Sequence, residues 1–319
     1  LSPNLRTRYV AGVSYGTDEG AGVRGGIERR WVNGRGHQLY GEAEVAQRRS
    51  ALYAEYAFPQ FAARISRYTI ATRWQDEQTD NIDARSFLLS GNAIARGHHW
   101  YAQASLNALD GSFLVGARSA GQERQSTRVV YPELRYERVL AEDRVHPARG
   151  ASLDVRVLAA SDRVLSDVSL LQGRATLKGI VPAGFGARLI AQLTLGATST
   201  EDFARLPPEL RFFAGGDRSV RGYGYQDLGD RDEEGLAIGG RYLATTSIEY
   251  EREFMPGWSA AGFVDAGDVW SRGEPHLELG VGAGLRWQSP VGPIRIDIAR
   301  GFDDIAGGWQ LHLSAGPDL

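Results

Sequence analysis

Apolar and polar residues alternate with a period of two along most of the chain. In residues 99–109 one face carries tryptophan, leucine and alanines, and the opposite face carries glutamine, serine and asparagine. Residues 187–197, 277–287 and 294–298 repeat the pattern, with charged side chains opposite the apolar face. Successive side chains of a β-strand point to opposite faces, so the pattern predicts strands that are apolar on one side and polar on the other.

The predicted strands are long and numerous. Many run to about ten residues, which matches the ~9–11 residues that a tilted strand needs to cross a bilayer, whereas strands of soluble β-sandwiches usually have ~5–6. We therefore expect an all-β fold, a transmembrane antiparallel β-barrel of about 16 strands, an even number as in single-chain bacterial barrels. A soluble β-sandwich is the alternative. The expected strands cover residues 8–16, 21–32, 36–47, 50–58, 62–76, 82–96, 98–117, 127–139, 151–160, 168–179, 185–199, 236–253, 257–270, 276–289, 292–301 and 308–316.

Short and long connections alternate between these strands. Turns with glycine or proline occupy residues 33–36, 59–60, 96–97 and 289–292, and longer connections occupy residues 118–126, 161–167 and 200–235. Short periplasmic turns and longer external loops are expected of an outer-membrane barrel. Residues 140–150 depart from this expectation, because they form a long connection on the periplasmic side. No linker divides the chain, so we expect residues 1–319 to form one barrel domain.

The composition is mildly hydrophilic and still compatible with a barrel. The mean hydropathy is −0.32, a value to which alternating strands average out. No segment approaches the ~18 consecutive apolar residues of a membrane helix. The net charge of −3 indicates no nucleic-acid partner. The chain has no cysteine, which removes disulfides and thiolate metal sites, and we expect no cofactor.

Residues 200–235 form the longest connection and the one most informative about function. Residues 211–225 read RFFAGGDRSVRGYGY. Paired glycines and arginines among aromatic residues predict a tightly folded loop with a buried cation, since glycine permits positive φ and close backbone approach. A phosphate-binding interpretation of this glycine-rich loop is weak, because neither a Lys-Ser/Thr pair nor a strand-to-helix context follows it.

This loop resembles the loop-six signature of the BamA/TamA superfamily of outer-membrane assembly and translocation barrels. The resemblance rests on FFAGGD (residues 212–217) followed by VRGY (residues 220–223). It continues through SIEY (247–250), FVDAG (263–267) and WQSPVGPI (287–294), which are similar to later strands and turns of the family. The resemblance spans essentially the whole chain.

Both ends of the chain are similar to the TamA branch, the translocation and assembly module. The opening TRYV (7–10) and the ending LSAGPDL (313–319) carry this likeness, whereas BamA ends on an aromatic residue. Residues 1–8 contain no apolar core of a signal peptide, and an outer-membrane protein must be exported. We therefore expect that a signal peptide and, as the resemblance implies, N-terminal POTRA domains are absent from this sequence.

The resemblance implies a barrel of the Gram-negative outer membrane, with loop six folded into the lumen and no enzymatic activity. TamA-type barrels work with TamB, an elongated partner anchored in the inner membrane, to insert outer-membrane proteins, notably autotransporters. The pair is also linked to moving phospholipid to the outer membrane. The partners implied for this chain are thus a TamB-type protein, client outer-membrane proteins and outer-membrane lipids.

Two carboxylates are expected on the inner wall of the barrel. Glu249 and Asp265 lie on the polar faces of their predicted strands, so both point into the lumen, where a loop arginine could bond them. The resemblance implies that Arg221 is tied to both acids. The loop-six motif that it assigns consists of Val220, Arg221, Gly222 and Tyr223. Without the resemblance, solvated lumen charges would be the simpler interpretation of the two acids.

An enzyme is one alternative function. Proteases and lipid hydrolases need a nucleophile or an acid–base pair within reach of the substrate. Six histidines are present, and His98-His99 lies at an expected periplasmic turn. Neither a Gly-x-Ser-x-Gly nor a His-Glu-x-x-His motif occurs, so we expect no catalytic residues.

A seam is expected where the first strand meets the last. Glycines inside the first predicted strand, residues 8–16, weaken its pairing with a neighbouring strand. A glycine at the end of the last predicted strand, residues 308–316, and the proline that follows it do the same. A weak seam would permit lateral release into the membrane, and ordinary fraying of chain ends is an equally simple interpretation. The seam residues are Val10, Gly12, Val13, Leu311, Leu313 and Gly316. A two-partner-secretion transporter or passive pore, which passes its substrate through the lumen, is the second alternative function.

Overall fold

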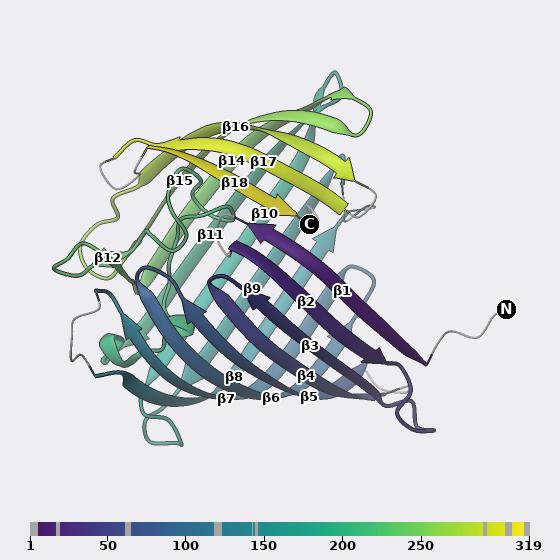
Figure 1. The fold of residues 1–319 in the computed structure, drawn as a ribbon, viewed down its shortest axis with the longest axis vertical. Coiled ribbons are helices and arrows are strands. Elements are labelled where there is room, and N and C mark those ends of the chain that lie inside the picture. The colour runs from purple at the N-terminus through teal and green to yellow at the C-terminus, as the bar shows by residue number, and fades with distance from the viewer. Residues whose placement is uncertain are drawn as a thin grey trace.

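The computed structural model forms one antiparallel sheet of 16 strands that curls into a barrel (Figure 1). It describes residues 6–16, 20–60, 65–117, 123–141, 143, 146–289, 292–303 and 308–315. Each strand pairs with its neighbour along the chain, and β11 pairs with β14 across the longest connection. The strands of the sheet are β1 (Thr7–Gly16), β2 (Gly20–Arg29), β3 (Gln38–Ala46), β4 (Arg49–Pro59), β5 (Arg67–Gln78), β6 (Ile82–Arg96), β7 (Trp100–Val115), β8 (Gln125–Leu140), β9 (Gly150–Ala160), β10 (Leu170–Gly184), β11 (Ala187–Thr200), β14 (Tyr242–Met255), β15 (Trp258–Trp270), β16 (Glu278–Ser289), β17 (Gly292–Gly301) and β18 (Trp309–Ala315). The prediction of a 16-stranded antiparallel barrel is confirmed.

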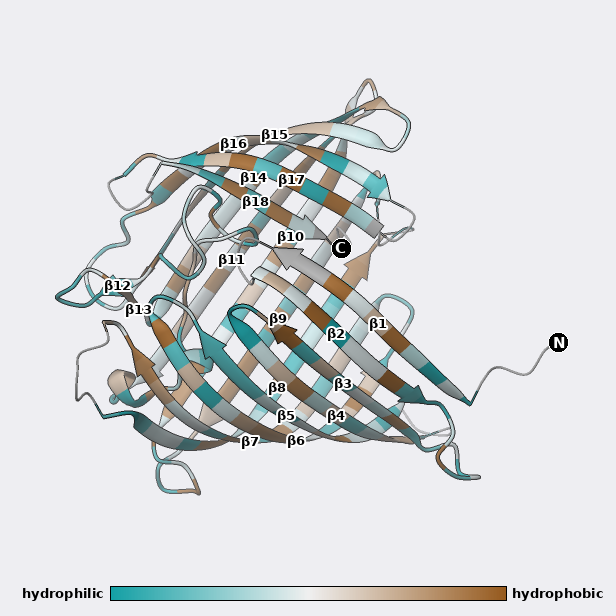
Figure 2. Ribbon diagram, in the orientation of Figure 1, coloured by the Kyte–Doolittle hydropathy of each residue, from teal (hydrophilic) through white to brown (hydrophobic). Residues whose placement is uncertain are grey.

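Apolar side chains cover the outside of the barrel and polar ones line the inside. On β6 and β7, Leu89 and Leu106 are exposed on the outer surface, while Ser90 and Asn107 are buried inside and joined by a 2.7 Å hydrogen bond. Figure 2 shows the hydrophobic and hydrophilic residues alternating along the strands. This arrangement suits an exterior that meets lipid and an interior that meets water and the loop.

The predicted boundary that differs most from the structure is the start at residue 236, because residues 236–241 do not begin a strand of the wall. Within them β13 (Ala237–Gly239) pairs with β12 (Asp230–Arg231) in a small hairpin of the long connection. Gly239 has a φ of +79°, a left-handed conformation that ends the hairpin. The wall strand β14 therefore begins only at Tyr242.

The long loop, which comprises residues 201–241, folds back into the barrel (Figure 1). It contains two short 3-10 turns, η1 (Phe203–Arg205) and η2 (Pro208–Leu210). Leu206 and Leu210 pack against an apolar cluster on the inner faces of β7 to β10. No helix in the described part of the chain is long and apolar enough to cross a membrane. The loop thus supplies much of the packed core inside the barrel.

Hydrogen bonds also tie the long loop to the end of the barrel near β6 and β7. The Asn81 Nδ2 atom donates to the carbonyl oxygens of Gln226 at 3.0 Å and Ala237 at 2.9 Å. The Ala117 N–H, just after β7, donates to Asp232 at 2.6 Å. These bonds hold the loop on one side of the lumen while its Arg221 end contacts the other side.

The long connection between β8 and β9 is held at the barrel by a hydrogen bond from a buried arginine. Arg188 of β11 donates from Nη1 to the carbonyl oxygen of Pro147 at 2.9 Å. Its Nη2 atom pairs with Glu251 of β14 at 2.8 Å, and both side chains are buried. The contact with Arg188 fixes residue 147 of the connection to the inner side of the wall.

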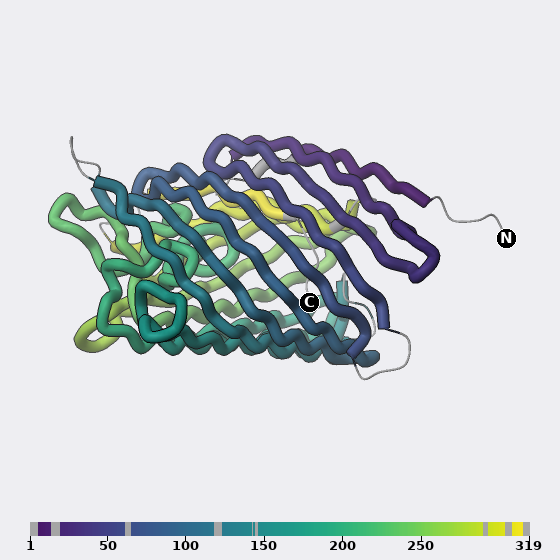
Figure 3. Tube along the Cα trace, turned by 90° about the horizontal axis from the view of Figure 1, so that it is seen from below, coloured from purple at the N-terminus to yellow at the C-terminus, as the bar shows by residue number. Residues whose placement is uncertain are grey.

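The two edge strands of the sheet are β1 and β18. All ten residues of β1 pair with β2, and the ladder continues through Gly12 opposite Arg24. The seven residues of β18 pair with β17. Over the described ranges, no ladder joins β1 to β18, although the two strands lie next to each other (Figures 1 and 3). The wall therefore has two backbone edges at this position.

Candidate functional site

Glycines let the long loop bring Arg221 against the inner wall. Gly222 has a φ of +100°, and a Cβ atom there would lie 2.6 Å from the backbone nitrogen of Gly301 in β17. Gly215 has a φ of +95°, and its Cβ would lie 2.3 Å from the carbonyl oxygen of Gly224. A side chain at either position would collide with backbone, so glycine is required for this loop path.

The Arg221 guanidinium is bonded to carboxylates from three strands. It makes a two-point contact with Asp265 of β15, from Nε at 2.7 Å and from Nη2 at 2.9 Å, and the Arg221 N–H adds a bond of 3.0 Å to the same carboxylate. Its Nη1 atom lies 2.8 Å from Glu249 of β14 and 3.2 Å from Asp297 of β17. The structure thus brings together the three residues that the resemblance pairs, and adds Asp297 to them.

A second arginine completes this charge cluster. Arg286 of β16 donates to Glu249 at 2.9 Å and to Asp297 at 2.6 Å. The Arg221 cluster, meaning Arg221, Arg286, Glu249, Asp265 and Asp297, therefore holds two cations and three carboxylates, all less than a tenth exposed. Sequence reasoning missed the roles of Arg286 and Asp297. Both lie on polar strand faces, but only the strand register shows that they meet the loop.

An aromatic ring and a column of glycines shape the floor beneath Arg221. The Arg221 Cζ atom lies 3.3 Å from the centre of the Phe263 ring, a close cation–π contact. A Cβ on Gly282 would lie 2.4 Å from that ring, and one on Gly280 would lie 1.9 Å from the Arg221 carbonyl oxygen. The alternate glycines of β16 therefore leave the space in which the loop sits.

The rest of the loop-six motif anchors the loop to the last strands. Val220 and Tyr223 are fully buried in an apolar cluster with residues of β14 and β15, and the Tyr223 hydroxyl donates to the carbonyl oxygen of Leu279 at 3.2 Å. The Gly222 N–H donates to Nε2 of His312 at 3.1 Å, which requires an unprotonated Nε2. His312 belongs to β18, so the motif also contacts the strand at the seam.

The environment of Arg221 keeps it charged. Burial lowers the pKa of Arg221, but its hydrogen bond to Asp265 and the charges of Asp265, Glu249 and Asp297 raise that pKa above its ordinary value. Each charged group of the cluster takes part in an ion pair, so none of them is free to act as a base. Among the described residues, no three or more His, Cys, Asp or Glu side chains are arranged to hold a metal ion.

Comparison with known families decides what kind of barrel carries this cluster. The Omp85 superfamily domain matches residues 32–316, which include the long loop and the strands β3 to β18. The chain belongs to the Omp85 superfamily. It is accordingly a β-barrel of the bacterial outer membrane.

Individual relatives agree with this assignment. The outer membrane protein assembly factor BamA of Nitratidesulfovibrio vulgaris is 32% identical over 123 residues, which are 36% of this chain and 16% of that protein. The crystal structure of BamA from Haemophilus ducreyi lacking POTRA domains 1–3 has a TM-score of 0.84 at 17% identity, covering 98% of this chain and 70% of that one. CdiB from Acinetobacter baumannii has a TM-score of 0.60 at 15% identity, covering 97% and 59%. At these identities the two solved structures establish the fold alone.

The expected seam residues of this Omp85 barrel lie on both faces of its edge strands. Val13 of β1 is 88% exposed and Leu311 of β18 is 56% exposed, so both lie on the outer face. Leu313 shares the face of Leu311 by alternation, while Val10 and Gly12 lie on the inner face of β1. The remaining seam position, residue 316, is outside the described ranges.

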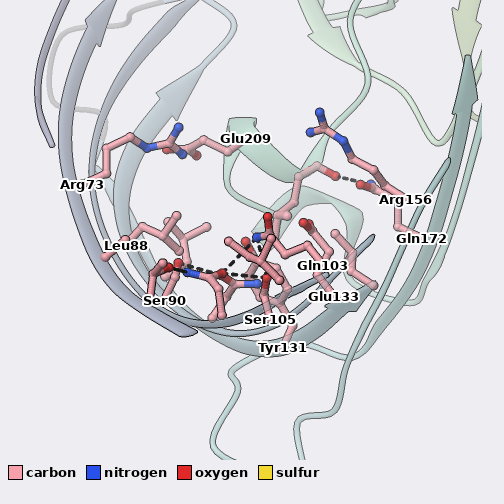
Figure 4. Close-up of a pocket in the computed structure, with 18 of the residues that line it drawn as sticks. Arg73, Leu88, Ser90, Gln103, Ser105, Tyr131, Glu133, Arg156, Gln172 and Glu209 are labelled. Atoms are coloured by element: carbon pink, nitrogen blue, oxygen red, sulfur yellow. Dashed lines mark hydrogen bonds between the residues drawn. The ribbon is translucent and has the colours of Figure 1, made fainter. Parts of the chain in front are cut away.

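The Omp85 barrel also encloses a cavity of about 490 Å³ away from the Arg221 cluster. Its walls are the inner faces of β4 to β10 and residues 209–212 of the long loop. Figure 4 shows arginines reaching in from opposite sides, with a floor of hydrogen-bonded polar side chains. On that floor the Gln103 Nε2 atom donates to Asn92 at 3.0 Å and to Ser105 at 2.8 Å.

Proposed function

We propose that this Omp85 barrel is the TamA-type subunit of a translocation and assembly module. In this role it aids the insertion or secretion of outer-membrane proteins such as autotransporters, through a lateral seam between β1 and β18. The observation that carries the proposal is the missing ladder between these two strands in the described residues. The TamA-like opening and ending of the chain support the choice of branch within the superfamily.

The position of the seam follows from the cost of breaking a ladder in lipid. Backbone groups that lose their partners in the bilayer core find no water to replace them. Opening between any two interior strands would therefore break a complete ladder, whereas parting β1 from β18 breaks none that the described residues contain. The Arg221 cluster holds β14 to β17 together around the loop. We infer that this wall stays fixed while the β1 side moves.

The partners of such a module lie partly outside this chain. We expect the barrel to follow a signal peptide and periplasmic POTRA domains in its natural protein, as one barrel domain of a longer chain. We expect it to work with a TamB-type partner anchored in the inner membrane. Outer-membrane phospholipid is the second class of client, because a seam that admits a strand also connects the lumen with the bilayer.

Engineered disulfides test the seam directly, since the chain contains no cysteine that would interfere. Val13 and Leu313 lie on the outer faces of β1 and β18, so the pair Val13→Cys and Leu313→Cys can form a disulfide across the seam. Cysteine pairs at neighbouring positions test other registers between the two strands. We expect the oxidised seam to abolish autotransporter assembly in cells and reduction to restore it. Heat-modifiable migration on a denaturing gel should not change, because folding does not require opening.

The matched control locks two interior strands. Leu134 of β8 and Val157 of β9 are direct partners in the ladder, and both are exposed on the outer face. The disulfide between Leu134→Cys and Val157→Cys should leave activity intact. Full activity of the locked seam would contradict lateral opening. Passage through the lumen, as in a two-partner-secretion transporter or passive pore, would then be the better account.

A further inference from the structure

The lumen cavity between β4–β10 and the long loop has the features of a ligand site. We propose that it binds a phosphate ester through Arg73, Arg156 and Arg174. These arginines belong to β5, β9 and β10, away from the strands that hold Arg221. The proposal is independent of the TamA-type function, because it rests on the charges and the size of the cavity.

The cavity is positively charged within a chain that is negative overall. Five arginines and three glutamates line it, which gives a formal charge of +2, whereas the whole chain carries −3. Arg211 of the long loop contributes one of these charges, and its guanidinium bonds backbone carbonyl oxygens, those of Leu206 and Ile238 among them. Its charge is therefore not cancelled by an acid. An anion entering the cavity meets a net attraction that low-dielectric walls strengthen.

Two of the lining guanidinium groups lack partners. Neither Arg73 nor Arg174 makes a hydrogen bond or ion pair with any described residue. The Nε atom of Arg73 is buried without a partner, whereas the Arg174 side chain is exposed inside the barrel. Burying a polar group without a partner costs free energy. A ligand that accepts hydrogen bonds would remove this cost, and Figure 4 shows that the Arg73 side chain reaches into the cavity.

A row of three arginines crosses neighbouring strands beside the cavity. Arg156 stands directly opposite Arg135 of β8 on one side and Arg174 of β10 on the other. Asp154 pairs with both Arg135 at 2.7 Å and Arg156 at 3.3 Å, and Glu137 pairs with Arg135 at 3.3 Å. Arg174 makes no ion pair with a described residue. Like charges directly opposite in a sheet are destabilising. The two acids offset two of these three charges, and Arg174 is left as the charge that an anion would pair.

The acids that face the cavity limit the size of the anion. Glu133 and Glu209 line it and have no ion-pair partner among the described residues. They would repel a long polyanion such as a nucleic acid. They would attract a cationic group on the same ligand, as in ethanolamine phosphate.

Size and lining point to the headgroup part of a molecule and not to acyl chains. A volume of about 490 Å³ lies in the range of small-molecule sites, ~300–1,000 Å³. Serine, asparagine and glutamine side chains of β6, β7 and β10 form much of the surface. Arginine forks match phosphate oxygens in two-point contacts, and phosphate offers more oxygens than a carboxylate for several arginines at once. Phosphate is therefore the better fit.

Calorimetric titration of the purified barrel in detergent tests the site. The ligands are inorganic phosphate, ethanolamine phosphate and dihexanoyl phosphatidylethanolamine, with an acidic peptide as the competing class. We expect the phosphate compounds to bind and Arg156→Gln/Arg174→Gln to weaken binding at least about tenfold. The unliganded double variant should unfold at the same or a higher temperature, because it loses a repulsion.

The control variant is Arg128→Gln, whose arginine lies on the outer face, 66% exposed and paired with Asp110. It should bind like the original chain. Binding of the short-chain lipid would identify a lipid headgroup as the source, and binding of the soluble esters alone would identify a free phosphate ester. Absence of phosphate binding, binding of the acidic peptide alone, or equal affinity of the double variant would overturn the proposal.

Discussion

At the scale of single residues, Arg221 is held by carboxylates from three strands and by an aromatic ring. It bonds Asp265 at two points, Glu249 and Asp297 at one each, and rests on the Phe263 ring. Taking charges out of water is costly, and such a cluster is stable only when every member is paired. Removal of one cation therefore lowers the stability of the barrel by more than the energy of its own contacts, because it leaves buried carboxylates unpaired.

We predict that Arg221→Ala destabilises the barrel by ~3–5 kcal/mol, the usual cost of leaving buried charges unpaired. The variant leaves Arg286 in contact with Glu249 and Asp297, and it leaves Asp265 without a cation. Arg221→Lys should recover only part of the loss, because lysine lacks the planar fork that contacts Asp265 at two points. The free energy of unfolding in urea, followed by heat-modifiable migration, measures both effects.

Two further variants distinguish the cost of unpaired buried charges from the loss of stability that any substitution of an arginine would cause. Asp265→Asn in the Arg221→Ala background should restore part of the stability by removing one unpaired charge. Arg128→Ala on the outer surface should cost at most about 1 kcal/mol, as exposed ion pairs do. Equal losses from Arg221→Ala and Arg128→Ala would show that the cluster does not stabilise the loop.

At the scale of elements, β18 depends on the long loop for contacts that a second neighbouring strand would otherwise supply. It has a ladder on one side only in the described residues. On its inner face, His312 is 3% exposed and accepts the hydrogen bond from Gly222. Asp297, which belongs to the Arg221 cluster, is the direct partner of His312 in the ladder. The loop and the edge strand thus contact each other at His312.

We predict that His312→Ala loosens β18 without unfolding the barrel. One hydrogen bond contributes about 1 kcal/mol. This is a small part of the stability of the whole barrel, but a large part of the local stability of a strand that has a ladder on one side only. Hydrogen exchange followed by mass spectrometry should show faster exchange in residues 309–315. Exchange in β8 and β9 should stay as in the original chain.

The glutamine variant at the same position distinguishes the hydrogen bond from packing. His312→Gln keeps an acceptor at similar reach and should recover most of the protection of β18. Ser314→Ala, on the same face of the strand, should have little effect. If His312→Gln exchanges as fast as His312→Ala, the bond to Gly222 does not hold the strand.

At the scale of the whole molecule, the long loop crosses the lumen, and no ladder over the described residues joins the two edge strands of the wall. The loop is bonded to Asn81 next to β6 and, through Arg221, to Asp265 of β15, so it spans the interior of the barrel. The BamA relative of Nitratidesulfovibrio vulgaris is far longer than this chain, which covers 16% of it through the matched segment. We therefore propose that the barrel is the membrane-embedded part of a longer protein.

We predict that the reading frame upstream of this sequence encodes three POTRA domains, as the resemblance to the TamA branch implies. Sequencing that region would test the prediction, and five POTRA domains would indicate BamA instead. A tagged full-length protein should also co-purify with a TamB-type protein after crosslinking in cells. Recovery of outer-membrane clients without that partner would contradict the TamA assignment while leaving the Omp85 family intact.

The sequence by itself determined the class of the fold and the faces of its strands. Period-two alternation is local, because each side chain's face depends only on its position along its own strand. It therefore predicted the inward direction of Glu249 and Asp265, and the resemblance of the loop motif predicted that Arg221 would meet them. The contacts in the structure agree with both statements.

Only the tertiary structure decided which inward residues meet. Arg286 and Asp297 join the cluster through the register of β15 to β17, and Arg174 stands opposite Arg156 through the register of β9 and β10. The hairpin of β12 and β13 depends on how the loop packs inside the barrel. Register and loop path are set by contacts between residues far apart in the chain, and a pattern read along one strand contains no information about them.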